Sequence, residues 1–187
     1  MQSWINKRID AASWPRTLIS IAALLAYSFW MYRPSGRFLQ AKNSAGTLPE
    51  EMFGFPENEP TRAISQLFGL EGDYMLFQAI DIPYAVLNFF AFTAIFALAL
   101  KSYRLSATPL RFVMLLPAVY LIAEFFENTL LVVLTRNAGE SASLAHIQQA
   151  FTSLKLTAGF PSMILALLSL IALSILFLSK FIRGKSA

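Results

Sequence analysis

The sequence predicts an all-α, polytopic membrane protein, and three observations lead to that class. The chain of 187 residues is 56% hydrophobic and only 14% charged, and its mean hydropathy is +0.55. Four apolar segments approach or exceed the about 20 residues that a helix needs to cross a hydrocarbon core. These segments are apolar on nearly all sides, whereas a helix of a soluble bundle carries a polar face.

The apolar segments predict a single transmembrane domain over residues 1–187, with four transmembrane helices. The helices cover about 14–32, 80–100, 110–135 and 149–179, and an outer loop covers 33–78. The segment at 14–32 is read as an uncleaved helix, because it ends in aromatic residues and no small-residue cleavage pattern follows.

A short amphipathic outer helix is predicted between the first and second transmembrane helices. Residues 59–68 place Pro60 at a permitted first helical position and Ile64, Leu67 and Phe68 on one face. Three roles are open for such a helix: a cap on the bundle, an anchor on the lipid surface, or a moving lid.

The distribution of lysine and arginine predicts the orientation in the membrane. Three segments carry nine of them: Lys7, Arg8, Arg16, Lys101, Arg104, Arg111, Lys180, Arg183 and Lys185. By the positive-inside rule these segments are cytoplasmic, so both termini are expected in the cytoplasm of a bacterial cell, with the protein in its plasma (inner) membrane. This pattern explains the pI near 9.5, so we expect no nucleic-acid partner, whereas anionic lipid is favoured.

Cysteine and histidine usage excludes several chemistries. The chain has no cysteine and one histidine, which is His146 in the outer loop before the fourth predicted helix. Thiol catalysis, thiolate metal sites, haem held by paired histidines and Ser-His catalysis therefore lack their main group. We expect neither a metal ion nor a cofactor.

The third predicted helix carries the most costly side chains of the chain. Glu124, Glu127 and Asn128 interrupt an otherwise apolar run at 112–134. A charged residue near mid-membrane costs about 2.5–3.5 kcal/mol on insertion scales, so such residues usually face a bundle interior or a wet cavity. Tyr120 lies one turn before Glu124 on the same face. These four residues are candidates for a functional site.

The second predicted helix offers a matching polar stripe. Asp81, Tyr84 and Asn88 recur at i, i+3 and i+7, and therefore share a face. With a rise of about 1.5 Å per residue, Asn88 is expected at the level of Glu124, and Tyr84 at the level of Glu127 or Asn128.

The fourth predicted helix completes the site with one lysine. Gln148, Thr152, Lys155, Gly159 and Ser162 lie on a single stripe of that helix. Lys155 can pair with Asp81 or Glu127, or extend toward the lipid headgroups. We therefore predict an outward-facing polar pocket between the second, third and fourth helices. Its catalytic candidates are Glu124 and Glu127, and its ligand-binding candidates are Asp81, Tyr84, Asn88, Tyr120, Asn128 and Lys155.

Several functions fit such a pocket, and the sequence leaves open whether the protein is an enzyme. Carboxylates a turn apart cannot both ionise cheaply, so at least one of Glu124 and Glu127 is expected to hold a proton unless Lys155 compensates. The favoured function is binding of a membrane lipid, another amphiphile or a partner membrane protein. The alternatives are an intramembrane acid-base lipid-modifying enzyme that uses Glu124 and Glu127, a proton-coupled carrier, and a purely structural set of interhelical contacts worth about 0.6–2 kcal/mol each.

Short motifs give the chain a likeness to one family. These motifs are Phe53-Gly54-Phe55, Gly69-Leu70-Glu71-Gly72, Asp81-Ile82-Pro83-Tyr84 and Glu124-Phe125-Phe126-Glu127-Asn128. They resemble a group of uncharacterised bacterial four-helix integral membrane proteins, which carry an Asp-x-Pro-aromatic stretch in helix two and a Glu-Asn motif in helix three. The chain departs from that pattern at Glu124, where Asp is expected, and at Asp73, where a basic residue is expected. The resemblance implies a four-helix fold and brings no activity.

Overall fold

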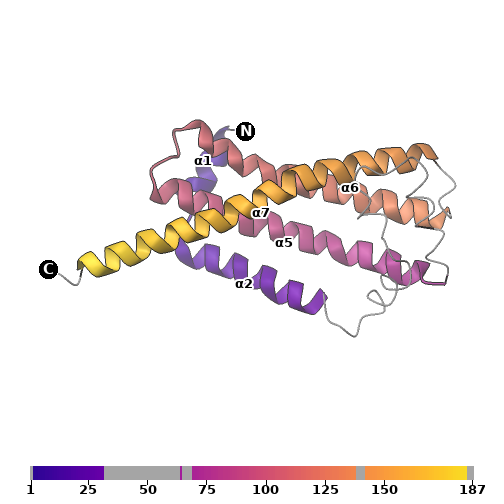
Figure 1. Ribbon diagram of the computed structural model, residues 1–187, viewed down its shortest axis with the longest axis horizontal. Helices are drawn as coiled ribbons and strands as arrows, with labels where there is room; N and C mark the ends of the chain where they lie inside the picture. The colour runs from indigo at the N-terminus through magenta and orange to yellow at the C-terminus, as the bar shows by residue number, and fades with distance from the viewer. Residues whose placement is uncertain (1, 32–63, 65–68, 138–141, 185–187) are drawn as a thin grey trace.

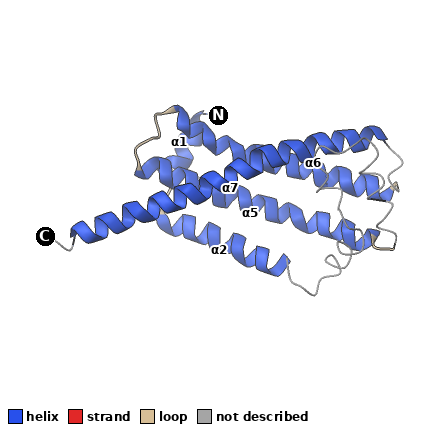
Figure 2. Ribbon diagram, in the orientation of Figure 1, coloured by secondary structure: helices blue, strands red, loops and turns tan. Residues whose placement is uncertain are grey.

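The computed structural model describes residues 2–31, 64, 69–137 and 142–184, and every element in these ranges is a helix (Figure 2). The order is α1 (Gln2–Asp10), α2 (Trp14–Met31), α5 (Glu71–Ser102), the 3-10 helix η2 (Pro109–Leu115), α6 (Leu116–Arg136) and α7 (Ala142–Gly184). The predicted all-α class is therefore confirmed for the described part of the chain.

Three helical segments are long and apolar enough to cross a membrane. Within the described residues they are Glu71–Ser102, Pro109–Arg136 and Ser143–Ile182. They form a lengthwise bundle of α5, α6 and α7, with α2 alongside α5 (Figure 1). α2 has 18 residues and includes Pro15 and Arg16 in its first turn, and it is not among the three. Four crossings therefore stay a prediction.

The helices extend beyond their predicted bounds. α5 begins at Glu71 rather than near residue 80, and α7 runs from Ala142 to Gly184. The third predicted helix consists of η2 followed by α6. Pro117 accounts for this change of helix type, because it has no N–H to donate to the carbonyl of Val113. The Leu116 N–H bonds to that carbonyl instead, in the tighter 3-10 pattern.

The N-terminal helix α1 is absent from the sequence prediction, which treats residues 1–13 as a basic tail. Ile5 and Ile9 of α1 are buried in an apolar core with Phe96 of α5, Met114 of η2 and Ala166 of α7. Helices shorter than about 12–15 residues are marginal in isolation, so burial against the bundle stabilises this one.

The predicted outer helix at 59–68 lies outside the described residues, with one exception. Ile64 is helical and buried, in contact with Leu134 of α6 and Ala145 of α7. At this residue the chain packs on the bundle, which is the arrangement that a cap requires.

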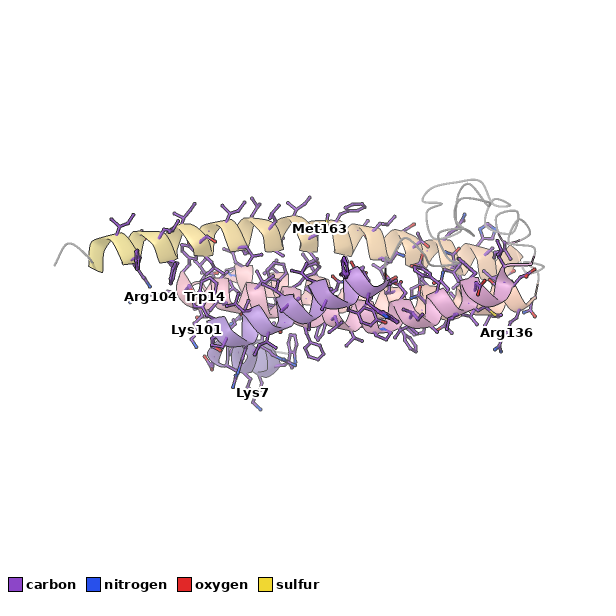
Figure 3. All side chains as sticks on the ribbon, turned by 90° about the horizontal axis from the view of Figure 1, so that it is seen from below. Lys7, Trp14, Lys101, Arg104, Arg136 and Met163 are labelled. Atoms are coloured by element: carbon purple, nitrogen blue, oxygen red, sulfur yellow. The ribbon has the colours of Figure 1, made fainter. Side chains whose placement is uncertain are left out.

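Basic residues lie toward both ends of the bundle, with more of the labelled ones at one end. Lys7, Lys101 and Arg104 lie toward one end and Arg136 lies at the other (Figure 3), and we call the first the basic end. There the Lys101 ammonium donates to the carbonyl oxygens of Asp10, at 2.7 Å, and Ala12, at 2.9 Å. A cation is favourable at these C-terminal carbonyls, so Lys101 ties α1 to α5. The final turns of α7 also lie toward the basic end (Figure 1).

Candidate functional site

One lysine of α7 contacts two glutamates of α6. The Lys155 Nζ lies 3.5 Å from the Glu124 Oε1 and forms a close ion pair with the Glu127 Oε2. Glu127 is 0% exposed and Glu124 is 3% exposed, whereas the Lys155 side chain keeps 13%. The spacing of three residues places both carboxyl groups on the face of α6 that meets α7. The predicted pairing of Lys155 with Glu127 is therefore confirmed.

Two further residues of α7 extend this contact into a chain of hydrogen bonds. The Thr152 hydroxyl donates to the Glu127 Oε1 at 2.5 Å, and the Gln148 Nε2 donates to the Thr152 Oγ1 at 2.7 Å. Both residues are fully buried. The predicted set of site residues omits them, although their spacing with Lys155 already places them on one face.

α5 joins the same region through a buried carboxyl group. The Asn128 Nδ2 donates to the Asp81 Oδ2 at 3.1 Å, whereas the Asn88 Nδ2 donates to the Tyr84 carbonyl of its own helix at 3.1 Å. The sequence places Tyr84 at the level of Glu127 or Asn128, so the observed register differs by about one turn.

The predicted tyrosines border this region. The Tyr120 ring packs directly on Gly159, where an added Cβ would lie 2.9 Å from the ring Cδ2. The Tyr120 phenol interacts electrostatically with Glu124, Asp81 and Tyr84. Glycine at 159 therefore lets α6 and α7 approach with an aromatic ring between them.

α2 contributes one residue that the sequence prediction does not include. The Tyr27 hydroxyl donates to the Ile80 carbonyl at 2.8 Å, and its phenol interacts electrostatically with Asp81. Tyr27 is the only tyrosine of α2, and only the packing of α2 beside α5 shows that it approaches the carboxyl groups.

These residues form one region, which we call the polar cluster. Its members are Asp81, Tyr84, Asn88, Tyr120, Glu124, Glu127, Asn128, Gln148, Thr152 and Lys155. It contains the eight predicted site residues and the two polar residues of α7 that the prediction omits.

The polar cluster holds more acid than base. Asp81, Glu124 and Glu127 supply three carboxyl groups, and Lys155 supplies one ammonium. The buried Glu124 Oε2 has no hydrogen-bond partner among the described residues. In the same part of the chain, no three His, Cys, Asp or Glu side chains are placed to hold a metal ion. The cluster can therefore accept a proton or a hydrogen bond from a cationic group.

An apolar core separates the polar cluster from the basic end. Beyond Asn88, α5 buries Ala91, Ile95 and Phe96, and Phe96 packs with Met114 in the apolar core described above. The polar contacts of α5 in this cluster therefore stop at about the middle of the helix. Asp81, at 8% exposed, and the Lys155 side chain, at 13%, are its most exposed charged members.

The fold and the polar cluster together define a helical membrane protein with a buried, acid-rich interhelical site. Comparisons with the sequence profiles of known families, with curated proteins and with solved structures find no match to this chain.

Proposed function

We propose that the protein binds an amphiphile whose head group is cationic or donates hydrogen bonds, and that the polar cluster is the binding site. The excess of carboxyl groups over ammonium carries this proposal. A buried carboxylate is stable only when it is paired and hydrogen-bonded, and the Glu124 Oε2 lacks a hydrogen-bond partner among the described residues. A bound ammonium or hydroxyl group would supply that partner.

The surroundings of the polar cluster suit the apolar part of such a ligand. Phe125 and Phe126 of α6 and Ile122 are exposed on the bundle surface, and Phe126 stacks on Phe151 of α7 at a centroid distance of 5.0 Å. An acyl chain can lie along this surface while its head group enters beside Lys155, which keeps partial exposure.

The proposed orientation places the polar cluster in the outer half of a bacterial inner membrane. We propose four crossings, with α2 as the first, and both termini in the cytoplasm. The positive-inside rule and the grouping of basic residues at one end of the bundle support it (Figure 3). Reporter fusions at Ser106 and Ala142 are expected on opposite sides of the membrane, and equal accessibility of the two sites would contradict this topology.

An acid-base lipid-modifying enzyme is the second candidate function. The observation that favours it is the placement of Lys155 between Glu124 and Glu127, because two carboxyl groups beside one ammonium can exchange a proton. A proton-coupled carrier has less support, since a carrier needs a polar path to the other side and the buried residues of α5 beyond Asn88 include Ala91, Ile95 and Phe96.

Native mass spectrometry of the full chain, purified with its lipids, tests the proposal. Glu124→Gln keeps the volume but cannot carry charge, so this variant is expected to lose the bound amphiphile while its thermal stability holds. Glu71→Gln makes the same change in the first turn of α5, outside the polar cluster, and should retain the ligand.

Two other results would separate the alternatives. A co-purified protein in place of lipid would identify a partner membrane protein as the ligand. Full lipid retention by Glu124→Gln, together with lost stability in Glu127→Gln, would show that the polar cluster only holds the helices together.

A further inference from the structure

A second polar site lies at the basic end, between α1, α2 and α5. A cavity of about 240 Å³ opens there. Its polar lining consists of Arg8, Ser13, Arg16, Thr17, Ser20 and Thr93, and the remaining lining residues are alanines and Phe90. We call it the basic cavity. It shares no residue with the polar cluster.

The two arginines of the basic cavity are held in place without a carboxylate. The Arg8 guanidinium lies 5.7 Å from the ring centroids of both Trp4 and Phe90, and the Arg16 Nη1 donates to the Ala11 carbonyl at 2.7 Å. The ion pairs of the described residues include neither arginine. Asp10 ends α1 nearby but does not line the cavity. Two positive charges therefore face this space without a counter-ion from the described chain.

One hydroxyl group of the cavity also lacks a partner. Thr93 of α5 is 2% exposed, and its Oγ1 makes no hydrogen bond within the described part of the chain. The hydroxyls of Thr17 and Ser20, in contrast, donate to the backbone carbonyls of Ser13 and Arg16. A buried hydroxyl without a partner costs free energy, and a ligand oxygen in the cavity would remove that cost.

The start of α2 adds a further source of positive potential. α2 begins at Trp14; Pro15 has no N–H and the Thr17 N–H bonds to the Ser13 carbonyl, so the first turn offers the N–H groups of Trp14 and Arg16, beside residues that line the cavity. Free N–H groups at a helix start attract anions. The start of α2, the two guanidinium groups and the Thr93 hydroxyl all favour the same kind of ligand.

We propose that the basic cavity binds a phosphate group, supplied by the head group of an anionic phospholipid or by a soluble phosphate ester. Guanidinium groups bind phosphate oxygens through paired, charge-assisted hydrogen bonds. The Thr93 hydroxyl and the N–H groups at the start of α2 supply neutral donors. This site would act alongside the polar cluster and does not depend on the function proposed for it.

The depth of Arg8 also favours such a ligand if α5 spans a membrane. Phe90, which contacts Arg8, precedes Lys101 by eleven residues, and that is roughly 16 Å along the helix. An arginine at this depth is costly unless an anion or a wet cavity accompanies it. A phosphate group drawn into the cavity would provide the anion.

The test uses the full chain in phosphatidylcholine nanodiscs with or without phosphatidylglycerol. Native mass spectrometry measures the retained phosphatidylglycerol, and thermal unfolding measures the stabilisation that this lipid gives. Arg8→Gln and Arg16→Gln are each expected to retain phosphatidylglycerol about ten-fold more weakly than the unaltered chain, the effect of losing a charge-assisted contact. Lys7→Gln is the matched control, because it removes one charge from α1 outside the cavity.

A substitution of an uncharged residue keeps the test decisive even if the arginine variants misfold. Thr93→Val removes the hydroxyl at nearly constant volume, so the fold should persist while phosphatidylglycerol binding weakens several-fold. Inorganic phosphate, added to phosphatidylcholine nanodiscs, separates the two sources. Stabilisation by phosphate that is lost in Arg8→Gln assigns a soluble ligand, and stabilisation by phosphatidylglycerol alone assigns the lipid. If both arginine variants and Thr93→Val behave as Lys7→Gln does, the proposal is overturned.

Discussion

The polar cluster and the basic cavity differ in whether their charged side chains contact groups of opposite charge. In the polar cluster, an ammonium from α7 meets carboxyl groups from α6, and Thr152 and Gln148 continue the hydrogen bonding. In the basic cavity, Arg8 and Arg16 face a hollow without a carboxylate among the described residues. The charged groups of the polar cluster meet partners within the chain, whereas no described carboxylate pairs with the two arginines of the basic cavity. The two regions therefore favour ligands of opposite charge.

The largest expected effect is the loss of the single ammonium in the polar cluster. Lys155→Met leaves Glu124 and Glu127 buried without a cation, and we expect the free energy of unfolding to fall by about 3–5 kcal/mol. Arg16→Met removes a cation from the basic cavity, where no described carboxylate pairs with it. Its cost should stay below about 1 kcal/mol. Denaturant unfolding in detergent measures the stability of both variants. Equal losses would contradict the difference between the two regions.

The next effect tests how closely the helices approach at the polar cluster. Gly159→Ala would place a Cβ 2.9 Å from the Tyr120 ring, so the ring must move, at a cost of about 1–3 kcal/mol. Gly72→Ala, in the first turn of α5, meets nothing within 4 Å and serves as the control. We expect that control to be neutral or slightly stabilising. A neutral Gly159→Ala in thermal unfolding would mean that the cluster is loosely packed.

A threonine-to-valine substitution in each region compares a bonded hydroxyl with one that has no described partner. Thr152→Val removes the hydroxyl that bonds Glu127 and Gln148, and we expect a loss of about 1–2 kcal/mol. Thr93→Val removes a buried hydroxyl without a described partner, so in lipid-free detergent its stability should hold or rise. Thermal unfolding of the two variants checks this difference in sign. A loss of stability in Thr93→Val without ligand would show that its hydroxyl has a partner in the free protein.

The smallest effect concerns the connection between α5 and η2 at the basic end. Arg104 has a backbone φ of 57°, in the left-handed region that favours glycine. Arg104→Gly is expected to stabilise the protein by about 1 kcal/mol, because the strain is removed. Arg104→Ala removes the same charge but keeps the strain, so its unfolding midpoint should not rise. Equal midpoints for the two variants would show that the conformation costs little.

The sequence predicts the long helices well because their signal is strong. Runs of apolar residues identified α5, η2 with α6, and α7, and the polar residues within those runs identified the polar cluster. The bounds were less accurate, since helices continue past the apolar runs to residues such as Glu71 and Gly184. The short α1 was missed, because its two buried isoleucines give too weak a pattern in nine residues.

Helical spacing predicted that the polar residues of the candidate site face one another, and it predicted their pairing only in part, because the ion pair of Lys155 with Glu127 was one of several open alternatives. Helical spacing placed Asp81, Glu124, Glu127 and Lys155 on facing stripes, which is a local property of each helix. Which group meets which depends on tilt and on the axial offset between helices. The observed bond from Asn128 to Asp81 therefore differs by about one turn from the predicted register. Tyr27 was missed for a related reason, since its partner Ile80 lies on a different helix.

Hydropathy and helical spacing are local properties of the chain, so they are enough to predict an all-α membrane protein and the positions of its costly polar groups. How those groups combine depends on the packing of the helices. This packing brought Lys155 between Glu124 and Glu127, and it placed α1 against α5 so that Arg8 and Arg16 border a cavity with Thr93. Such contacts join residues far apart in the chain, and their geometry depends on how whole helices pack rather than on any short stretch of sequence.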